Sequence, residues 1–403
     1  MARYDFHDLS SLDFEELVRD LLQSEWGVRL ESFKTGADEG IDLRFSTDAA
    51  STLIVQCKHS AISGVSKLLS NLRQSEEAKV ARLKPPRYVL VTSTGLTPAN
   101  KTDIKEIFSP YINSFQDIIG RDDLNNLLGR HPDIERSNFK LWLTSTEVLS
   151  RVLHNAEHFQ TELEIDRIRG KLRLYVQSVA YPRALKILDE HRIVAISGVP
   201  GIGKTTLAEM LLYEHLERDY EPVVIRSDVV EAKRQYKAGK KQIFYFDDFL
   251  GQTFLRDQSG YMYHNQDAAL VDFMDAVKRS KTARFILTTR EHILRNALLY
   301  SERLRHSALW DYHCILELSD YSLVQKGRIL FNHLYFSELP TEYKRELLQE
   351  NFYLKIVKHQ NFSPRIIEWL SSYSRVKSEA ATNYRDLFNT DTGSTGRAVA
   401  PRV

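Results

Sequence analysis

The segment from Gly198 to Thr205 constrains the fold of this chain more than any other feature. It reads Gly-Val-Pro-Gly-Ile-Gly-Lys-Thr, which fits the pattern GxxxxGK[ST], and it lies between an apolar run at 192–197 and a helix-forming run at 206–212. Glycines at these positions let successive backbone N–H groups curl around phosphate oxygens at a helix N-terminus. The segment therefore predicts a nucleotide site in a parallel α/β sheet, and a glycine turn beside a solvated lysine is the weaker interpretation.

The loop itself supplies the first contacts to a nucleotide. Lys204 offers a positive charge to the β and γ phosphate oxygens, and the hydroxyl of Thr205 coordinates Mg²⁺. The expected cofactors are therefore ATP and Mg²⁺. The other residues expected to surround the phosphates are Gly198, Pro200, Gly201, Gly203 and Thr206.

A magnesium ion in such a site also needs a carboxylate at the end of a neighbouring strand. The apolar run 243–246 ends in Asp247 and Asp248, which supply two. We expect Asp247 to hold the ion and Asp248 to polarise the attacking water as the catalytic residue. The alternative for the pair is a helix cap after a buried strand.

Two arginines are candidates for sensing the γ-phosphate. Arg290 follows the apolar run 285–288, where a cation would reach the phosphates, although it could instead pair with Glu291 at the surface. Ser363-Pro364-Arg365 begins a helix with proline in its first turn, so Arg365 is expected to project from a helix N-terminus as a second sensor.

Together these segments resemble the STAND class of signalling NTPases, closest to the group called novel STAND NTPase three, which is found in bacterial anti-phage proteins of the Avs kind. The resemblance implies a switch in which nucleotide exchange accompanies homo-oligomerisation and licenses an attached effector. Such proteins usually continue into a C-terminal repeat domain that senses the trigger. Because 403 residues leave little room for one, we expect an unknown phage trigger or a separate sensor protein as a partner. The resemblance covers about residues 180 to 375 and rests on Gly198–Thr205, Phe244–Gly251, Leu287–Glu291 and Ser363–Arg365.

A second constellation lies near the N-terminus, where Asp42 begins one β-like run and Gln56-Cys57-Lys58 ends the next. Phosphodiester hydrolysis needs a metal held by hard oxygen ligands and a cation beside the attacking water. Asp42 and Gln56 are the candidate metal ligands, and Lys58 is the candidate cation. Because side chains alternate along a strand, Gln56 and Lys58 share one face and Cys57 lies on the other. Taken singly, Asp42 also fits a turn and Lys58 a solvated edge position.

A further acid is expected from a helix at 10–26. Its apolar residues recur at i, i+3, i+4, i+7 and i+8 from Phe14. At about 100° per residue, Glu15 borders this buried stripe, whereas Glu16 faces away from it. Glu15 is therefore the candidate catalytic acid, and a solvated helix face is its alternative.

These residues, with Val91–Thr97 after the next strand, resemble the Mrr-like restriction endonucleases of the PD-(D/E)XK superfamily over about residues 8 to 110. The resemblance implies a metal-dependent site that cleaves double-stranded DNA. A glutamine in place of the superfamily's acid is a usual variant in the Mrr-like branch. The residues that match the family's catalytic set are Glu15, Asp42, Gln56 and Lys58.

Contact with DNA has to come from a local patch, because the net charge of the chain is only +1. The candidates are Lys58-His59 and a helix at 64–83, although a solvated helix face explains the latter equally well. The basic residues of this helix are Lys67, Arg73, Lys79 and Arg82.

Cysteine content and the N-terminus indicate a cytoplasmic protein. The two cysteines, Cys57 and Cys314, form no CxxC pair, which suits a reducing compartment and argues against structural zinc. The first eight residues are polar and acidic, unlike a signal peptide, and no stretch approaches the ~18 apolar residues of a membrane span. We expect no membrane partner.

The length predicts two to three domains, at roughly 150 residues each. Residues 1–140 alternate helices with short strands, which predicts a compact α/β sheet, and the Mrr-like resemblance implies that this is a restriction-endonuclease-like α/β/α domain. Strands alternating with helices from 181 to 300 predict a P-loop NTPase with a parallel sheet, so the fold class is α/β. The remaining segments are expected to be a helical connector at 141–180, a helical, winged-helix-like lid at 301–388 and a disordered tail at 389–403.

The leading hypothesis is a nucleotide-switched, metal-dependent DNA endonuclease of bacterial anti-phage defence. A different class of protein remains open, namely a nucleic-acid-binding or scaffold protein that does not cut and whose NTPase controls assembly. An ATP-driven restriction motor is a third possibility, but it predicts helicase-type motifs, which the sequence does not show.

Overall fold

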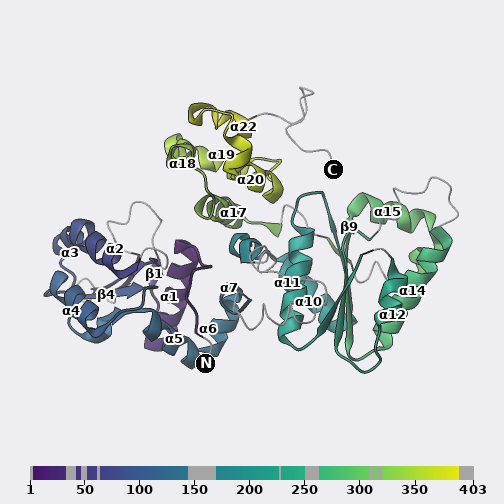
Figure 1. Ribbon diagram of the computed structural model, residues 1–403, viewed down its shortest axis with the longest axis horizontal. Coiled ribbons are helices and arrows are strands. Elements are labelled where there is room, and N and C mark those ends of the chain that lie inside the picture. The colour runs from purple at the N-terminus through teal and green to yellow at the C-terminus, as the bar shows by residue number, and fades with distance from the viewer. Residues whose placement is uncertain are drawn as a thin grey trace. The chain divides into compact units, whose positions relative to one another are not determined.

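The computed structural model describes residues 3–32, 42–46, 52–60, 64–143, 169–226, 228–249, 263–307, 313–315 and 320–389. The chain divides into two compact units, Met1–Leu149 and Ser150–Val403, each with its own sheet (Figure 1). Most of the predicted connector, at 144–168, and of the predicted tail, at 390–403, lies outside the described residues. No helix among the described residues has the length and apolar character to cross a membrane.

The first unit is built on a five-stranded mixed sheet in the order β1-β2-β3-β4-β5. Strands β1, β2 and β3 pair antiparallel, whereas β3, β4 and β5 run parallel. Strand β3 ends where the sequence predicts the end of a β-like run, at Lys58, whereas β5 was not predicted, because two residues carry no readable periodicity. The strands are Glu31–Ser32 (β1), Leu43–Ser46 (β2), Thr52–Lys58 (β3), Arg87–Thr92 (β4) and Ile118–Ile119 (β5).

Helices cover both faces of this sheet. One face packs on α1, which begins as predicted because the Ser10 hydroxyl accepts from the Asp13 N–H and the Asp13 carboxylate accepts from the Ser10 N–H. The predicted helix at 64–83 covers the other face and contains a π-helical turn in its middle. The helices are α1 (Ser11–Trp26), α5 (Arg121–Arg130), α6 (Pro132–Ser137) and α7 (Phe139–Leu143), and then α2 (Gly64–Asn71), the π turn η1 (Leu72–Glu76), α3 (Glu77–Leu83) and α4 (Pro98–Ile107).

The second unit holds a parallel five-stranded sheet in the order β10-β6-β9-β8-β7. The prediction of a parallel α/β sheet is confirmed. Because β9 lies between β6 and β8, the carboxyl ends of these three strands meet at one edge of the sheet. The short strand β10 was not predicted. The strands are Ile193–Gly198 (β6), Glu221–Ile225 (β7), Gln242–Phe246 (β8), Ala283–Arg290 (β9) and His313–Ile315 (β10).

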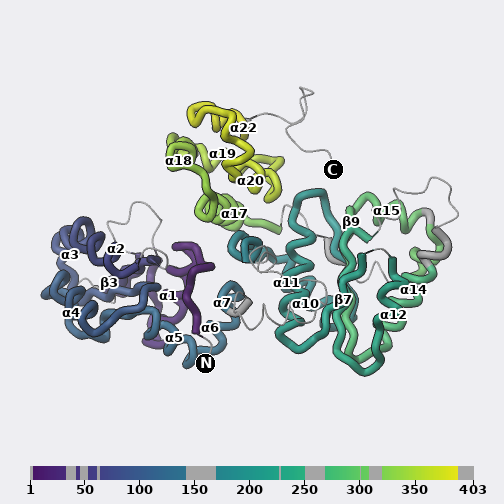
Figure 2. The backbone as a smooth tube through the Cα atoms, in the orientation of Figure 1, coloured from purple at the N-terminus to yellow at the C-terminus, as the bar shows by residue number. Residues whose placement is uncertain are grey.

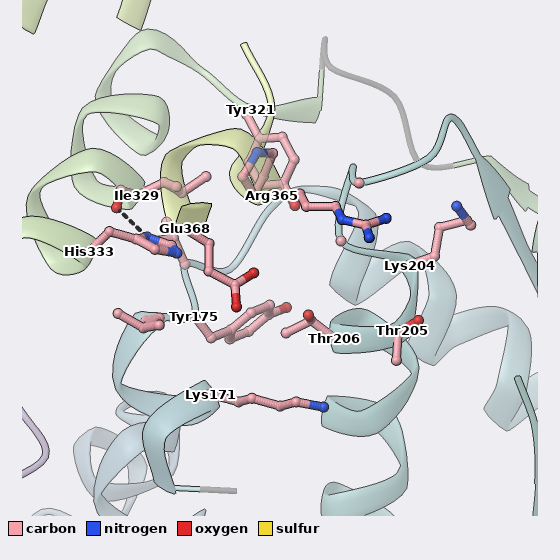
Figure 3. A pocket seen from close by; sticks show the side chains of 15 residues that line it. Lys171, Tyr175, Lys204, Thr205, Thr206, Tyr321, Ile329, His333, Arg365 and Glu368 are labelled. Carbon is pink, nitrogen blue, oxygen red and sulfur yellow. Dashed lines mark hydrogen bonds between the residues drawn. The ribbon is translucent and has the colours of Figure 1, made fainter. Parts of the chain in front are cut away.

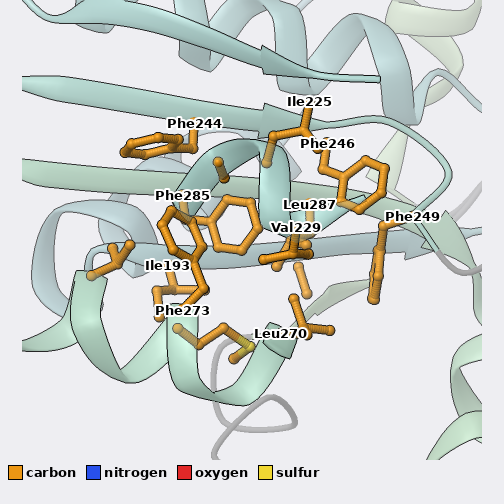
Figure 4. Close-up of a cluster of buried hydrophobic side chains, with 14 of the residues drawn as sticks. Ile193, Ile225, Val229, Phe244, Phe246, Phe249, Leu270, Phe273, Phe285 and Leu287 are labelled. Atoms are coloured by element: carbon orange, nitrogen blue, oxygen red, sulfur yellow. The ribbon is translucent and has the colours of Figure 1, made fainter. Parts of the chain in front are cut away.

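Two helical layers enclose the second sheet (Figure 2). One layer holds α10 (Ala180–His191) and α11 (Lys204–Glu217), and the other holds α12 (Val229–Gln235), α14 (Tyr263–Arg279) and α15 (Glu291–Tyr300). On the second face, aromatic rings form the centre of the core (Figure 4). The ring of Phe273 on α14 meets those of Phe244 and Phe285 edge to face, with centroids 4.9 and 5.2 Å apart.

Phe273→Ala is expected to destabilise the second unit by about 3 to 5 kcal/mol, because it leaves a cavity between sheet and helix. Hydrogen exchange followed by mass spectrometry on the full chain should show faster exchange in β8 and β9 and unchanged exchange in β3 and β4. Leu299→Ala, at a side chain that is 65% exposed on α15, is the matched control and should leave both sheets unchanged.

Beyond the sheet, the described residues 320–389 are helical and contain no strand. The helical character predicted for the C-terminal part is therefore confirmed over these residues, where no strands of a wing are found. The predicted lid at 301–388 also includes β10, which pairs with β6 in the sheet, and its role as a lid stays a prediction. Buried tyrosines tie the helices together, since the Tyr384 hydroxyl donates to the Leu370 carbonyl and the Tyr343 hydroxyl to the Glu379 carbonyl. From residue 302 onward the helices are α16 (Glu302–His306), α17 (Leu323–Tyr335), α18 (Thr341–Leu348), α19 (Phe352–Lys358), α20 (Pro364–Leu370), α21 (Tyr373–Val376) and α22 (Asp386–Asn389).

Candidate functional site

The antiparallel pairing of β2 with β3 brings Asp42 to the strand that carries Gln56 and Lys58. Leu43 pairs with Val55, so Asp42, which immediately precedes β2, lies level with the end of β3. Its Oδ2 accepts a hydrogen bond of 2.6 Å from the backbone N–H of Cys57. The predicted proximity of the acid and the strand is therefore present in the structure.

Gln56 and Lys58 face the layer of α2, η1 and α3, as strand alternation predicts. Gln56 is only 1% exposed, and both ends of its amide are engaged. Nε2 donates to Glu76 at 2.6 Å, while Oε1 accepts from the hydroxyl of Tyr88. Burial raises the pKa of Tyr88, so its hydroxyl stays protonated and able to donate. The carbonyl oxygen offered to a metal thus has one of its two lone pairs occupied.

Glu76 is a member of this site that the sequence-based reasoning missed. Its carboxylate is 3% exposed and lies 3.2 Å from the amine of Lys58 and 3.1 Å from that of Lys79. Burial alone would raise the pKa of Glu76, but the hydrogen bond from Gln56 and the charge of Lys58 outweigh it and lower the pKa to about 2. The signal was available, because Leu68, Leu72 and Val80 belong to a buried row, spaced four residues apart, whose third position is an acid.

Glu15 approaches β3 from α1, on the face opposite to Gln56 and Lys58. Both Glu15 and its neighbour Glu16 are half-buried. Burial raises the pKa of the Cys57 thiol, and the negative charges of Asp42 and Glu15 raise it further. Glu15 and Asp42 therefore act on the same point of β3, while the assignment of Glu15 as the catalytic acid stays a prediction.

The donor set in the first unit suits a hard divalent cation. Asp42 contributes a carboxylate and Gln56 an amide carbonyl, which are the oxygen ligands that Mg²⁺ prefers. Within the described residues, no group of three or more histidine, cysteine, aspartate and glutamate side chains is arranged to hold a metal. Residues 33–41, which precede Asp42 and include the acids Asp38 and Glu39, lie outside the described part of the chain.

In the second unit, β6 leads into the glycine-rich loop and α11 begins at Lys204. Gly201 and Gly203 have φ values of 79° and 106°, in the region where a glycine is favoured. The Nζ of Lys204 donates to the Val199 carbonyl at 3.1 Å, and burial lowers the pKa of this lysine. The loop therefore folds around its own lysine as the sequence predicts.

The carboxylates after β8 meet this loop. The Oγ1 of Thr205 donates to Oδ1 of Asp247 at 3.1 Å, so the two predicted magnesium ligands lie together. Thr288, at the end of β9, donates to the same Oδ1 at 2.5 Å and accepts from the backbone N–H of Asp248 at 2.8 Å. Thr288 therefore contacts both Asp247 and Asp248, although it was not predicted individually as a site residue.

Asp248 and Arg290 form a loose pair beside the loop. Oδ2 of Asp248 lies 3.7 Å from Nη2 of Arg290, so the predicted sensor pairs with the predicted catalytic carboxylate and not with Glu291. Asp248 has a φ of 45°, a conformation that aspartate tolerates at a small cost. Two oxygens here are buried and accept or donate no hydrogen bond among the described residues, Oδ1 of Asp248 and Oγ1 of Thr289. Unsatisfied buried oxygens at this edge fit a bound magnesium nucleotide.

A cavity of about 350 Å³ opens beside the loop and is closed by the helical part of the same unit (Figure 3). This volume falls within the range typical of small-molecule sites. Figure 3 shows Arg365 reaching from α20 towards the side on which Lys204 lies. The cavity is lined by Lys171, Tyr175, Gly201, Gly203, Lys204, Thr205, Thr206, Tyr321, His333, Arg365 and Glu368, among others.

Side chains of the helical part form hydrogen bonds with the backbone of the loop. The hydroxyl of Ser363 donates to the Gly201 carbonyl, and that of Tyr321 donates to the Ile202 carbonyl, both at 3.3 Å. A Cβ on Gly201 would lie 3.0 Å from the Cβ of Arg365. The predicted second sensor therefore sits directly against the phosphate loop, although Ser363 and Tyr321 were not predicted to hold it there.

Two family comparisons cover most of the two sheets. Residues 6–112 match the Mrr catalytic-domain family, described as Restriction endonuclease, and residues 175–336 match Novel STAND NTPase 3. Both resemblances inferred from the sequence are confirmed over these residues, whereas Ser363–Arg365 lies beyond the second match.

Individual relatives are similar to part of the chain. The Uncharacterized protein y4cD of Sinorhizobium fredii is 47% identical over 154 residues, a match that covers 38% of this chain and 24% of that protein. The chain therefore spans about a quarter of the length of this curated relative. Among solved structures, C. elegans PCH-2 is similar with a TM-score of 0.34 and 14% identity, over 60% of this chain and 70% of that one. NtrX from Brucella abortus in complex with ADP is similar with a TM-score of 0.27 and 13% identity, over 92% and 76% of the two chains.

Proposed function

We propose that this chain, which joins a restriction endonuclease domain at 6–112 to a Novel STAND NTPase 3 domain at 175–336, is a metal-dependent DNA endonuclease switched by ATP. One observation carries the proposal. The Asp42 carboxylate accepts a hydrogen bond from the strand that carries Gln56 and Lys58, which gathers the groups that phosphodiester cleavage needs. In the second unit, Thr205 is hydrogen-bonded to Asp247 beside the phosphate loop.

In the nuclease site, Asp42 and the Gln56 carbonyl would hold Mg²⁺ or a similar ion. When bound, such an ion supplies Lewis-acid activation of the phosphate and of water. Lys58 places a positive charge beside the scissile phosphate and stabilises the charge that develops there. Glu15 stays the candidate for a further acid on the α1 side of the strand.

In the nucleotide site, Lys204 would bind the β and γ phosphates while Thr205 and Asp247 hold the magnesium ion. Asp248 is placed to orient the attacking water, with Arg290 3.7 Å away to respond to the γ-phosphate. Arg365 would report the same phosphate to the helical part, because it lies against Gly201. Nucleotide exchange would thereby be coupled to homo-oligomerisation, which brings nuclease domains together for double-strand cleavage in anti-phage defence.

The direct test is plasmid cleavage by the full chain with Mg²⁺, with and without ATP, accompanied by mass photometry. We expect linear product and a larger assembly only when ATP is present. ATP-dependent assembly without cleavage would instead favour the scaffold function. Fast ATP turnover stimulated by DNA would favour a restriction motor.

A basic surface on the outer helix layer is proposed to bind DNA phosphates. Lys67, Arg73 and Arg82 are exposed, whereas Lys79 is partly occupied by Glu76. Replacing these three exposed residues together with glutamate should weaken DNA binding and reduce the slope of log affinity against log salt by about three. The measurement is fluorescence anisotropy across a salt series. The control replaces three exposed cations of the second unit, Lys186, Arg234 and Lys240, and an equal loss there would refute a specific surface.

A further inference from the structure

One buried carboxylate in the nuclease site has no role in the reaction as proposed above. Glu76 is 3% exposed, and its two oxygens together receive four donors. Oε2 accepts from Gln56 at 2.6 Å, while Oε1 lies 3.1 to 3.2 Å from the amines of Lys58 and Lys79 and from the hydroxyl of Ser75. Buried charges are rare in proteins unless they are paired in this way.

The helix is shaped to deliver this carboxylate. Leu68, Leu72, Glu76 and Val80 are its buried positions, spaced four apart. In a regular α-helix such a row drifts around the axis, and the wider π turn at Leu72–Glu76 counteracts the drift. Glu76 therefore points at β3 from a core position where an apolar side chain would pack without cost.

The contacts determine what Glu76 can do to its neighbours. An ionised carboxylate only accepts hydrogen bonds, so the amide of Gln56 must turn its Nε2 towards Glu76 and its Oε1 away. The same charge attracts the Lys58 amine to the level of Gln56. Three donors surround Oε1 and the Gln56 amide bonds to Oε2, so the carboxylate is engaged chiefly by the side chains around it.

We infer that Glu76 is the positioning residue of the nuclease site, which orients the Gln56 carbonyl and holds the Lys58 amine. Its carboxylate also places a negative charge next to Gln56, which is itself uncharged. The inference rests on the proposed nuclease function. The helix formed by α2, η1 and α3 would then both face DNA and position the catalytic groups of β3.

Three substitutions separate the contact of Glu76 with Gln56 from its contact with Lys58. Glu76→Gln keeps an acceptor for Gln56 but removes the charge that holds Lys58, Glu76→Ala removes both, and Glu76→Asp keeps the charge on a shorter stem. We expect cleavage at saturating DNA to fall about 10- to 100-fold in the glutamine variant and further in the alanine variant, with partial recovery in the aspartate variant. The KM for DNA should not rise, because no DNA-facing cation is removed and Lys79 loses its paired acid.

Asp117→Asn is the matched control. Asp117 is a carboxylate of the same unit that is 1% exposed and pairs with Arg87 at 2.7 Å, and it contacts none of Asp42, Gln56 and Lys58 in the hydrogen bonds and ion pairs described for it. Its substitution should lower the melting temperature as Glu76→Gln does and leave kcat unchanged. Equal losses of kcat in the two variants would reduce Glu76 to a stabilising residue and overturn the inference.

A second measurement needs no catalytic activity. Acetylation by an amine-reactive ester, followed by mass spectrometry, reports how available the Lys58 amine is relative to that of the exposed Lys84. Loss of the ion pair should raise the ratio severalfold in Glu76→Gln and leave it unchanged in Asp117→Asn. An unchanged ratio in Glu76→Gln would overturn the placement of Lys58 by Glu76.

These two measurements also keep the inference distinct from the proposed function. If the wild-type chain cuts no DNA, the nuclease proposal fails while the labelling ratio still decides whether Glu76 holds Lys58. If the wild type cuts and Glu76→Gln cuts faster, the carboxylate restrains Lys58 and the positioning role is wrong.

Discussion

Asp42→Asn is expected to reduce metal-dependent DNA cleavage by on the order of 1000-fold, since a metal bound by hard oxygen ligands loses its charged ligand and with it about 4 kcal/mol of transition-state stabilisation. The substitution is nearly isosteric. The asparagine Oδ1 can still accept the 2.6 Å hydrogen bond from the Cys57 N–H, so the strand pairing should survive. The measurement is the initial rate of plasmid linearisation with Mg²⁺ and ATP.

Two controls make the Asp42 result specific. Asp122→Asn removes an exposed carboxylate from the first turn of α5 and should cleave at the wild-type rate. Mass photometry of Asp42→Asn should still show ATP-dependent assembly, because the nucleotide site is intact. Cleavage within a factor of about three of wild type, in a variant that remains folded, would remove Asp42 from the active site.

Lys204→Ala is expected to weaken ATP binding by roughly 30- to 150-fold, because charge-assisted hydrogen bonds to phosphate are worth about 2 to 3 kcal/mol. Burial and the positive charge of Arg290 lower the pKa of Lys204, and the negative charges of Asp248 and Asp247 offset this only in part. Isothermal titration with ATP and Mg²⁺ gives the affinity. Cleavage by this variant should no longer increase when ATP is added.

The Lys204 variant tests the regulation of the nuclease by ATP separately from the cleavage reaction itself. Lys186→Ala, at an exposed position of α10, should bind ATP as the wild type does. The nuclease domain of Lys204→Ala should remain folded, with unchanged hydrogen exchange in β3 and β4. ATP-stimulated cleavage at the wild-type level in Lys204→Ala would show that the phosphate loop does not control the nuclease.

The sequence predicts those parts of the fold whose signals are local. The glycine-rich loop, the apolar strand before it and the helix after it lie within 25 residues, so strand β6 and helix α11 were read correctly. The end of β3 at Lys58 was also predicted correctly, because the apolar run before it is long. Strands β5 and β10 have two and three residues, and only their pairing with β4 and β6 identifies them as strands.

The sites were less predictable than the fold, because their membership depends on contacts between distant segments. Asp42 and Gln56 could be paired from their strand positions, whereas Glu76 is 20 residues from Gln56 and enters through a π turn that no propensity predicts. Similarly, the partner of Arg290 depends on the positive φ of Asp248, which turns the chain after β8. The sequence pointed to Glu76 in one way only, because it is an acid at a position of the helix where the pattern otherwise places apolar residues.

Gly201 belongs to the loop that is expected to bind phosphate, and it also lies against the helical part. A Cβ at Gly201 would lie 3.0 Å from the Cβ of Arg365 and from the Oγ of Ser363, so these neighbours would have to shift, and residues with a side chain rarely adopt its φ of 79°. Substituting Gly201 and substituting Lys204 are both simple ways to disable such a loop in a genetic experiment, yet they are different lesions in this protein. A Lys204 allele removes a charge and spares the docked helices, whereas a Gly201 allele also displaces them. A phenotype seen only with the Gly201 allele would therefore report the helical part and not the nucleotide.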